Sequence, residues 1–303
     1  MKSNRIFALI VFTFAFLLLF PNIKALDQHG DEKMYIWKAA YYSERLIKTD
    51  FSKGTDPYLD PGFDPKSFWA WEQPFGSHWI YAFAMGISNT QPPELPYSYT
   101  DFKLQGSETN IPPNTLFSAR LAAIICAATG LALLTLRFGW AGFISSIALL
   151  AIPFTGENLS RAWAEGPLML GFGLCAISYK TRWFPITLGV AAAFKLTALA
   201  LFPLLAITGS CGKEFHWRRY ISTLVPPFVV SLLTPVSWFF GGPLYLLIIF
   251  SLRIDTWLLQ SKTMPTFGGI FFPDRYLWPF VLLALLLIAH FSQPMIKKIR
   301  TQP

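Results

Sequence analysis

The chain has 303 residues, of which 53% are hydrophobic and 14% are charged, and its mean hydropathy is +0.42. Soluble globular domains carry about 25% charged residues, so this composition, with its apolar residues gathered in long runs, excludes an ordinary soluble domain and indicates a polytopic membrane protein. The net charge of +8 does not indicate nucleic-acid binding, because the basic residues cluster at the ends of apolar segments.

Residues 6–20 are predicted to form the first transmembrane span. Lys2 and Arg5 precede this apolar run and place the N-terminus in the cytoplasm. A cleaved signal peptide is the alternative, because "NIKA" before Leu26 offers a weak cleavage site. The remainder of the chain is itself rich in apolar runs, which makes an uncleaved span the simpler interpretation.

Residues 24–114 form a long polar region that we expect to be a large extracytoplasmic loop. It is rich in proline, aromatic and acidic residues. Two stretches in it, "MYIWKAAYYSERLI" and "HWIYAFAMGI", are apolar or amphipathic but too short to span a bilayer. They predict helices that lie on or near the membrane surface.

Residues 115–303 are expected to form a transmembrane bundle, so that 1–303 is a single all-α membrane domain with about seven or eight membrane segments. The later apolar segments are 116–136, 139–154, 162–178, 184–207, 221–240 and 276–291. The connections "YKTR" and "GKEFHWRRY" and the C-terminal "KKIR" are basic and are expected in the cytoplasm.

One segment conflicts with this topology. A single span over 184–207 would exit on the outer side, although the basic "HWRR" follows it. Lys195 stands at the middle of this segment, where a charge in the bilayer is costly. Two shorter arms that meet near Lys195 at the outer face would return the chain to the cytoplasm and resolve the conflict.

With this topology, four features share the outer face: the pair Asp31–Glu32, the stretch "WEQPFGSHW" (71–79), the stretch "ENLSRAWAE" (157–165) and Lys195. Ionisable residues inside or at the edge of a membrane are candidates for function. Arg275 lies in the last outer loop.

Each candidate also has a simpler interpretation. Asp31 fits a helix N-cap as well as a catalyst, and Glu32 fits the positive end of a helix dipole. Lys195 could extend toward the nearest interface. His78 fits an interfacial polar group.

Two further patterns occur in the 157–165 stretch. Arg161 and Glu165 stand four residues apart, which fits a plain ion pair on one helix. The run Asn158–Leu159–Ser160 matches the N-glycosylation pattern, which is common by chance.

Five stretches in order across about residues 6–207 resemble one family: "DEKMYIWKAAYYSERLIKTDF", "WEQPFGSHWIYAFAMGI", "FSARLAAIICAATGLALL", "LSRAWAEGPLMLGFGL" and "GVAAAFKLTALALFPLLAI". The first is similar to the pattern DE–x–x–Y–x–x–x–A, with Tyr35 and Ala39 or Ala40 in place. Together they resemble the GT-C superfamily of membrane glycosyltransferases, most closely the branch with protein O-mannosyltransferases and lipid A aminoarabinose transferases. The chain departs from that pattern at Gln73 and Phe75, and it has Glu165 where Asp is usual.

The resemblance implies a GT-C-like helical bundle that transfers a sugar from a polyprenyl-phosphate donor to the hydroxyl of a glycan, lipid or protein, on the outer face of a bacterial inner membrane. It implies that Asp31 is the general base and that Glu165 assists, or holds a divalent metal (Mg²⁺ or Mn²⁺) with Asp31 if one is used. Positive side chains would stabilise the departing phosphate. The substrate-binding candidates are Glu32, Glu72, His78, Arg161, Lys195 and Arg275.

Two alternatives remain open at this point. One is a catalytically inactive GT-C relative, in which Asp31, Glu165 and Lys195 would not converge on the outer side. The other is a membrane transporter or an accessory subunit of a lipid-linked glycan pathway, because a broken span around Lys195 also suits a substrate path. The two halves of the chain carry no inverted repeat, and the outer loop is large for a simple transporter.

Overall fold

The computed structural model describes residues 2–29, 32, 33, 35, 36, 39, 76–90, 111–179, 181 and 183–195. Every regular element in these ranges is an α-helix. The candidates Asp31, Glu72 and Arg275 lie outside the described residues, as do the predicted spans 221–240 and 276–291.

Two helices among the described residues are long and apolar enough to cross a membrane. The first runs over Ser3–Ala25, 23 residues that cover α1 (Lys2–Leu19), except for its first residue, and the short α2 (Asn22–Ala25). The second is α6 (Pro113–Phe138), with 26 residues. At 1.5 Å per residue these helices are about 35 and 39 Å long, against a hydrocarbon core of about 30 Å. Their length and composition support a helical membrane protein.

The predicted segment 139–154 is not one continuous helix. It forms α7 (Trp140–Leu150) and continues into α8 (Pro153–Ser160), and the two are bent by 95°. Pro153 explains the break, because proline disfavours helical backbone in the residue before it. Ile152 accordingly has extended backbone angles.

The helix predicted before Lys195 ends where the sequence indicates. After α9 (Glu165–Ser178), helix α10 covers Phe184–Phe194, and Lys195 has extended backbone with φ −160° and ψ 130°. The second arm of the expected hairpin lies outside the described residues.

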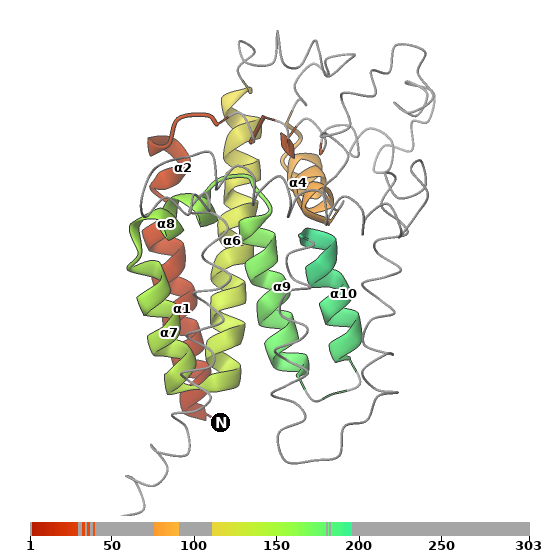
Figure 1. Ribbon diagram of the computed structural model, residues 1–303. Helices are drawn as coiled ribbons and strands as arrows, with labels where there is room; N and C mark the ends of the chain where they lie inside the picture. Colours follow the sequence, from red (N-terminus) through yellow and green to blue (C-terminus); the bar gives the residue numbers. More distant parts are fainter. Residues whose placement is uncertain are drawn as a thin grey trace, which may run out of the picture.

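The helices run alternately up and down, with α6 beside α1, α7 and α9 (Figure 1). At the lower end of this view, Asn4 Nδ2 donates to the carbonyl of Leu136 at 3.3 Å. At the upper end, Asn22 Nδ2 donates to Ser160 Oγ at 3.0 Å. The upper end is therefore defined by α2, α8, the start of α9 and the end of α10.

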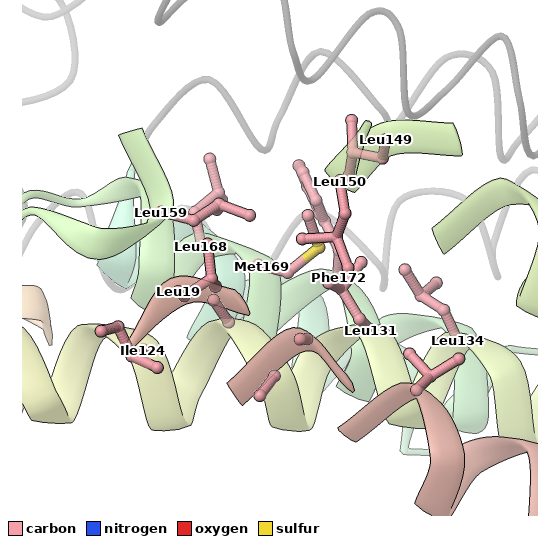
Figure 2. Close-up of a cluster of buried hydrophobic side chains, with 14 of the residues drawn as sticks. Leu19, Ile124, Leu131, Leu134, Leu149, Leu150, Leu159, Leu168, Met169 and Phe172 are labelled. Carbon is pink, nitrogen blue, oxygen red and sulfur yellow. The ribbon is translucent and has the colours of Figure 1, made fainter. Parts of the chain in front are cut away.

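A cluster of buried leucines and other apolar side chains fills the space between α1, α6, α7, α8 and α9 (Figure 2). Glycines let α6 and α9 approach closely, as small residues do in membrane helix pairs. A Cβ added at Gly166 would lie 2.5 Å from the carbonyl oxygen of Ala123, and one at Gly173 would lie 2.7 Å from that of Gly130. This contact fixes the height of Glu165, the first residue of α9, relative to α6.

The remaining helix, α4 (Gly76–Ile87), lies between α2 and α6 in the chain and begins at the upper end of α10. It was predicted to lie on or near the membrane surface, and one of its faces packs against α6, α9 and α10. That face contains Ser77, His78, Tyr81 and Met85, all buried, while Phe83 and Ile87 are exposed.

Candidate functional site

Five of the predicted site residues are described: Glu32, His78, Arg161, Glu165 and Lys195. Their contacts and those of the neighbouring Ser77 place them around the end of α8, the start of α9 and the end of α10. They come from segments that are far apart in the sequence. Hydrogen bonds and ion pairs join four of them into two groups, one around Glu32 and one between Glu165 and Lys195.

Glu32 is fully buried, and its carboxylate accepts five hydrogen bonds. Arg120 donates from Nε at 2.8 Å and from Nη2 at 2.7 Å, in a bidentate pair. Arg161 Nη1 donates at 3.0 Å. The backbone N–H groups of Ala162 and His29 donate at 3.0 and 3.2 Å. A carboxylate saturated in this way has little capacity left to bind substrate or to accept a proton.

The ionisation of Glu32 follows from these contacts. Burial alone would raise the pKa of the Glu32 carboxyl, because it disfavours the charged form. The hydrogen bonds and positive charge of Arg120, with the N–H groups of Ala162 and His29, outweigh burial and lower that pKa below its ordinary value. Glu32 is therefore a stable anion whose hydrogen bonds all come from within the protein.

Arg120 is also fully buried, and each of its five N–H groups has an acceptor. Two donate to Glu32. The other three donate to the carbonyls of Ile23 at 2.8 Å, Leu26 at 2.7 Å and Asp27 at 2.9 Å. The set is complete, because a guanidinium carries five donors.

The sequence prediction did not include Arg120 among the site residues. The signal for it was present: an arginine inside the apolar run "FSARLAAIICAATGLALL" is costly in a membrane unless it has a partner. The partner could not be identified from the sequence, because Glu32 is 88 residues away.

Arg161 binds two acids, Glu157 and Glu32. Its Nε and Nη2 donate to Glu157 Oε1 at 3.0 and 2.7 Å. Its Nη1 donates to the carbonyl of Asp27 at 2.7 Å and to Glu32. The alternative of a plain i,i+4 pair with Glu165 does not hold, because α8 ends at Ser160 and the helical spacing does not continue to Glu165.

Glu165 pairs with Lys195 instead. Lys195 Nζ donates to Glu165 Oε1 at 2.6 Å, and the two side chains are 16% and 3% exposed. Glu165 is the first residue of α9, where the helix dipole favours a negative charge. Lys195 follows the last residue of α10, so the pair joins the upper ends of two neighbouring helices.

Helix α4 connects the residues that flank this pair. The Tyr81 hydroxyl donates to the carbonyl of Trp163, two residues before Glu165. Ser77 Oγ donates to the carbonyl of Phe194 at 3.1 Å, directly before Lys195. His78 lies between these two contacts on the buried face of α4, and its ring stacks on Tyr35 with centroids 5.1 Å apart.

The described part of the site does not by itself fit a metal ion. Within the described ranges, no three His, Cys, Asp or Glu side chains are grouped to hold a metal. The Glu165 carboxylate already contacts the Lys195 ammonium, whose charge opposes a divalent cation at the same oxygen. Asp31, the other candidate ligand, lies outside the described residues.

The glycosylation pattern at 158–160 is inaccessible in this fold. Asn158 lies in α8 and is 6% exposed. Ser160 Oγ donates to the carbonyl of Gly156 at 2.7 Å and accepts from Asn22. Ser160 therefore joins α8 to α2.

Comparison with known proteins adds no family: no family model, no curated protein and no solved structure matches the chain. A function for the chain therefore depends on its own residues. The described residues provide a saturated structural carboxylate, Glu32, and a carboxylate–ammonium pair, Glu165 and Lys195, at the same end of the bundle.

Proposed function

We propose that the chain is a membrane glycosyltransferase of GT-C type, which moves a sugar from a polyprenyl-phosphate donor to an acceptor hydroxyl at the extracytoplasmic face of a bacterial inner membrane. The observation that supports this proposal best is the pair of Glu165 and Lys195. The two residues are 30 positions apart, and their charged groups meet at 2.6 Å. They do so at the end of the bundle that also holds Glu32, as the resemblance requires.

The reaction needs a base and a cation. In our proposal, Asp31 takes the proton of the acceptor hydroxyl while its oxygen bonds to the anomeric carbon of the sugar. The bond between that carbon and the phosphate oxygen breaks, and the polyprenyl phosphate leaves with the electron pair. A cation near this oxygen stabilises the charge that develops on it.

Lys195 is a better candidate than Arg161 for the phosphate contact. Four of the five N–H groups of Arg161 already bind Glu157, Asp27 and Glu32. Lys195 carries its charge on a flexible stem, and its ammonium lies 2.6 Å from Glu165 at the upper end of the bundle. Glu165 then keeps this ammonium in place until the phosphate arrives.

The remaining candidates have supporting roles. His78 is 1% exposed and stacked on Tyr35. We therefore assign His78 the role of packing α4 against its neighbours and not that of binding the sugar donor. Glu72 and Arg275 stay candidates for acceptor and phosphate contact, respectively, on the sequence pattern alone.

The test uses the full chain in nanodiscs with labelled polyprenyl-phosphate mannose and polyprenyl-phosphate aminoarabinose, and a membrane lipid and protein extract as acceptor. The wild-type chain should transfer label from one donor, and Asp31→Asn and Lys195→Ala should abolish transfer while the protein still accumulates. Lys24→Ala is the matched control, because Lys24 is exposed at the same end of the bundle. Full activity of Asp31→Asn would exclude the assigned base, and an inactive wild-type chain would favour an inactive relative.

A further inference from the structure

Arg120 lies where three parts of the chain meet at the upper end of the bundle. It enters from α6, and its guanidinium binds the carbonyls of Ile23, Leu26 and Asp27. Leu26 is the C-cap of α2 and has extended backbone. The last carbonyls of a helix have no partner within the helix, so Arg120 provides partners for them and fixes the direction in which the chain leaves α2.

The same guanidinium holds Glu32 by two parallel hydrogen bonds at 2.8 and 2.7 Å. Glu32 in turn accepts from Arg161 and from the N–H of Ala162, three residues before Glu165. A continuous set of buried contacts therefore runs from Arg120 through Glu32 to the segment that leads into Glu165. Asp31 is the covalent neighbour of Glu32 in the sequence.

We propose that Arg120 is a positioning residue for the transfer reaction, which acts through Glu32 to fix the place of the segment that leads into Glu165. This proposal rests on the glycosyltransferase function proposed above. Arg120 does not contact the substrate, because all five of its donors are used within the protein.

The arrangement is more specific than stability requires. A buried ion pair is often replaceable by apolar residues without loss of stability. The Arg120 guanidinium does more than pair with a charge, because its planar set of donors binds three carbonyls and two carboxylate oxygens. Only arginine has this planar fork, and a lysine provides the charge without the geometry. Catalysis is sensitive to such geometry, because a misplacement of about 1 Å costs about 100-fold in rate.

The test compares Arg120→Lys with Arg137→Lys in the full chain in nanodiscs. Both arginines belong to α6, and Arg137 is exposed at its lower end. Two quantities are measured: kcat and KM with the labelled donor that the wild-type chain accepts, and hydrogen exchange of the amides of His29 and Ala162. Both amides donate to Glu32 and report directly on its position.

We expect Arg120→Lys to lower kcat by about 10- to 100-fold, with KM for the donor changed less than threefold. Exchange at His29 and Ala162 should become faster, while peptides from the lower half of α6 keep the wild-type exchange rates. Arg137→Lys should match the wild-type chain in both measurements.

Three results would overturn the proposal, and they are distinguishable. If exchange at His29 and Ala162 becomes faster and kcat stays within twofold, Arg120 stabilises the fold without setting the reaction geometry. If every peptide exchanges faster, the effect is general destabilisation. If the wild-type chain transfers no sugar while Arg120→Lys still changes exchange at these two amides, the glycosyltransferase function fails and Arg120 has a structural role only.

Discussion

The buried carboxylate Glu32 and the half-exposed carboxylate Glu157 provide a matched pair of substitutions. Both side chains accept hydrogen bonds from Arg161, but Glu32 is fully buried and the Glu157 side chain is 48% exposed. Glu32→Gln and Glu157→Gln make the same chemical change in two environments. The difference in their effects on the free energy of unfolding measures what burial adds to the interaction.

The magnitude follows from the acceptors that are lost. Oε1 of Glu32 accepts from Arg120 and Ala162, and Oε2 accepts from Arg120, Arg161 and His29. An amide nitrogen placed at either oxygen would face at least two donors and accept from none. Breaking a buried ion pair from one side costs about 3–5 kcal/mol, whereas an exposed pair contributes about 0–1 kcal/mol. We expect Glu32→Gln to be the more destabilising by at least about 2 kcal/mol.

The assay is reversible unfolding of the full chain in mixed micelles by titration with a denaturing detergent, followed by circular dichroism. The wild-type chain, the two single variants and the double variant are compared under the same conditions. Equal effects of the two substitutions within about 1 kcal/mol, or a larger effect at Glu157, would refute the argument, because burial and hydrogen-bond saturation would then add nothing.

Two further predictions concern pH and helix packing. The pKa of Glu32 is lowered from its ordinary value of 4.5. The contribution of the Glu32 carboxylate to stability is therefore complete above about pH 4.5 and is lost as the pH falls through the lowered pKa. The free energy of unfolding, measured between pH 6 and 3, should depend less on pH in Glu32→Gln than in the wild-type chain. Gly173→Ala places a Cβ 2.7 Å from the carbonyl oxygen of Gly130 and should lower the free energy of unfolding by about 1–3 kcal/mol. Gly156→Ala, whose Cβ has no neighbour closer than 3.8 Å, should raise it by up to about 1 kcal/mol; equal effects of the two alanines would contradict the close contact between α6 and α9.

The positions of the helices at 6–20, 116–136 and before Lys195 could be predicted from the sequence, because they depend on the length of apolar runs and on where charges interrupt them. The apolar runs set which segments are helical, and one charge, Lys195, marks the end of α10. The alternation of helix directions that follows also predicted that 157–165 and Lys195 lie at one end.

The partners of the charged side chains could not be predicted in the same way. The spacing of Arg161 and Glu165 indicates a pair only if the helix is continuous, and the chain is bent over 161–164. That bend is held by contacts from distant segments, namely Tyr81 on the carbonyl of Trp163 and Glu32 on the N–H of Ala162. A single sequence contains no signal for contacts between residues 82 and 130 positions apart.

The two described carboxylates of the site therefore differ in what they can do. Glu32 accepts five hydrogen bonds from four residues, so a change in its charge or place disturbs α2, α6 and the bend before α9 together. Among the described residues, Glu165 holds one partner, the single ammonium of Lys195. An anionic donor that binds Lys195 would compete with Glu165 for the ammonium, and this contact is separate from the hydrogen bonds around Glu32. In the proposed function, Lys195 therefore contacts the phosphate of the donor, while Glu32 and Arg120 position the segment that leads into Glu165.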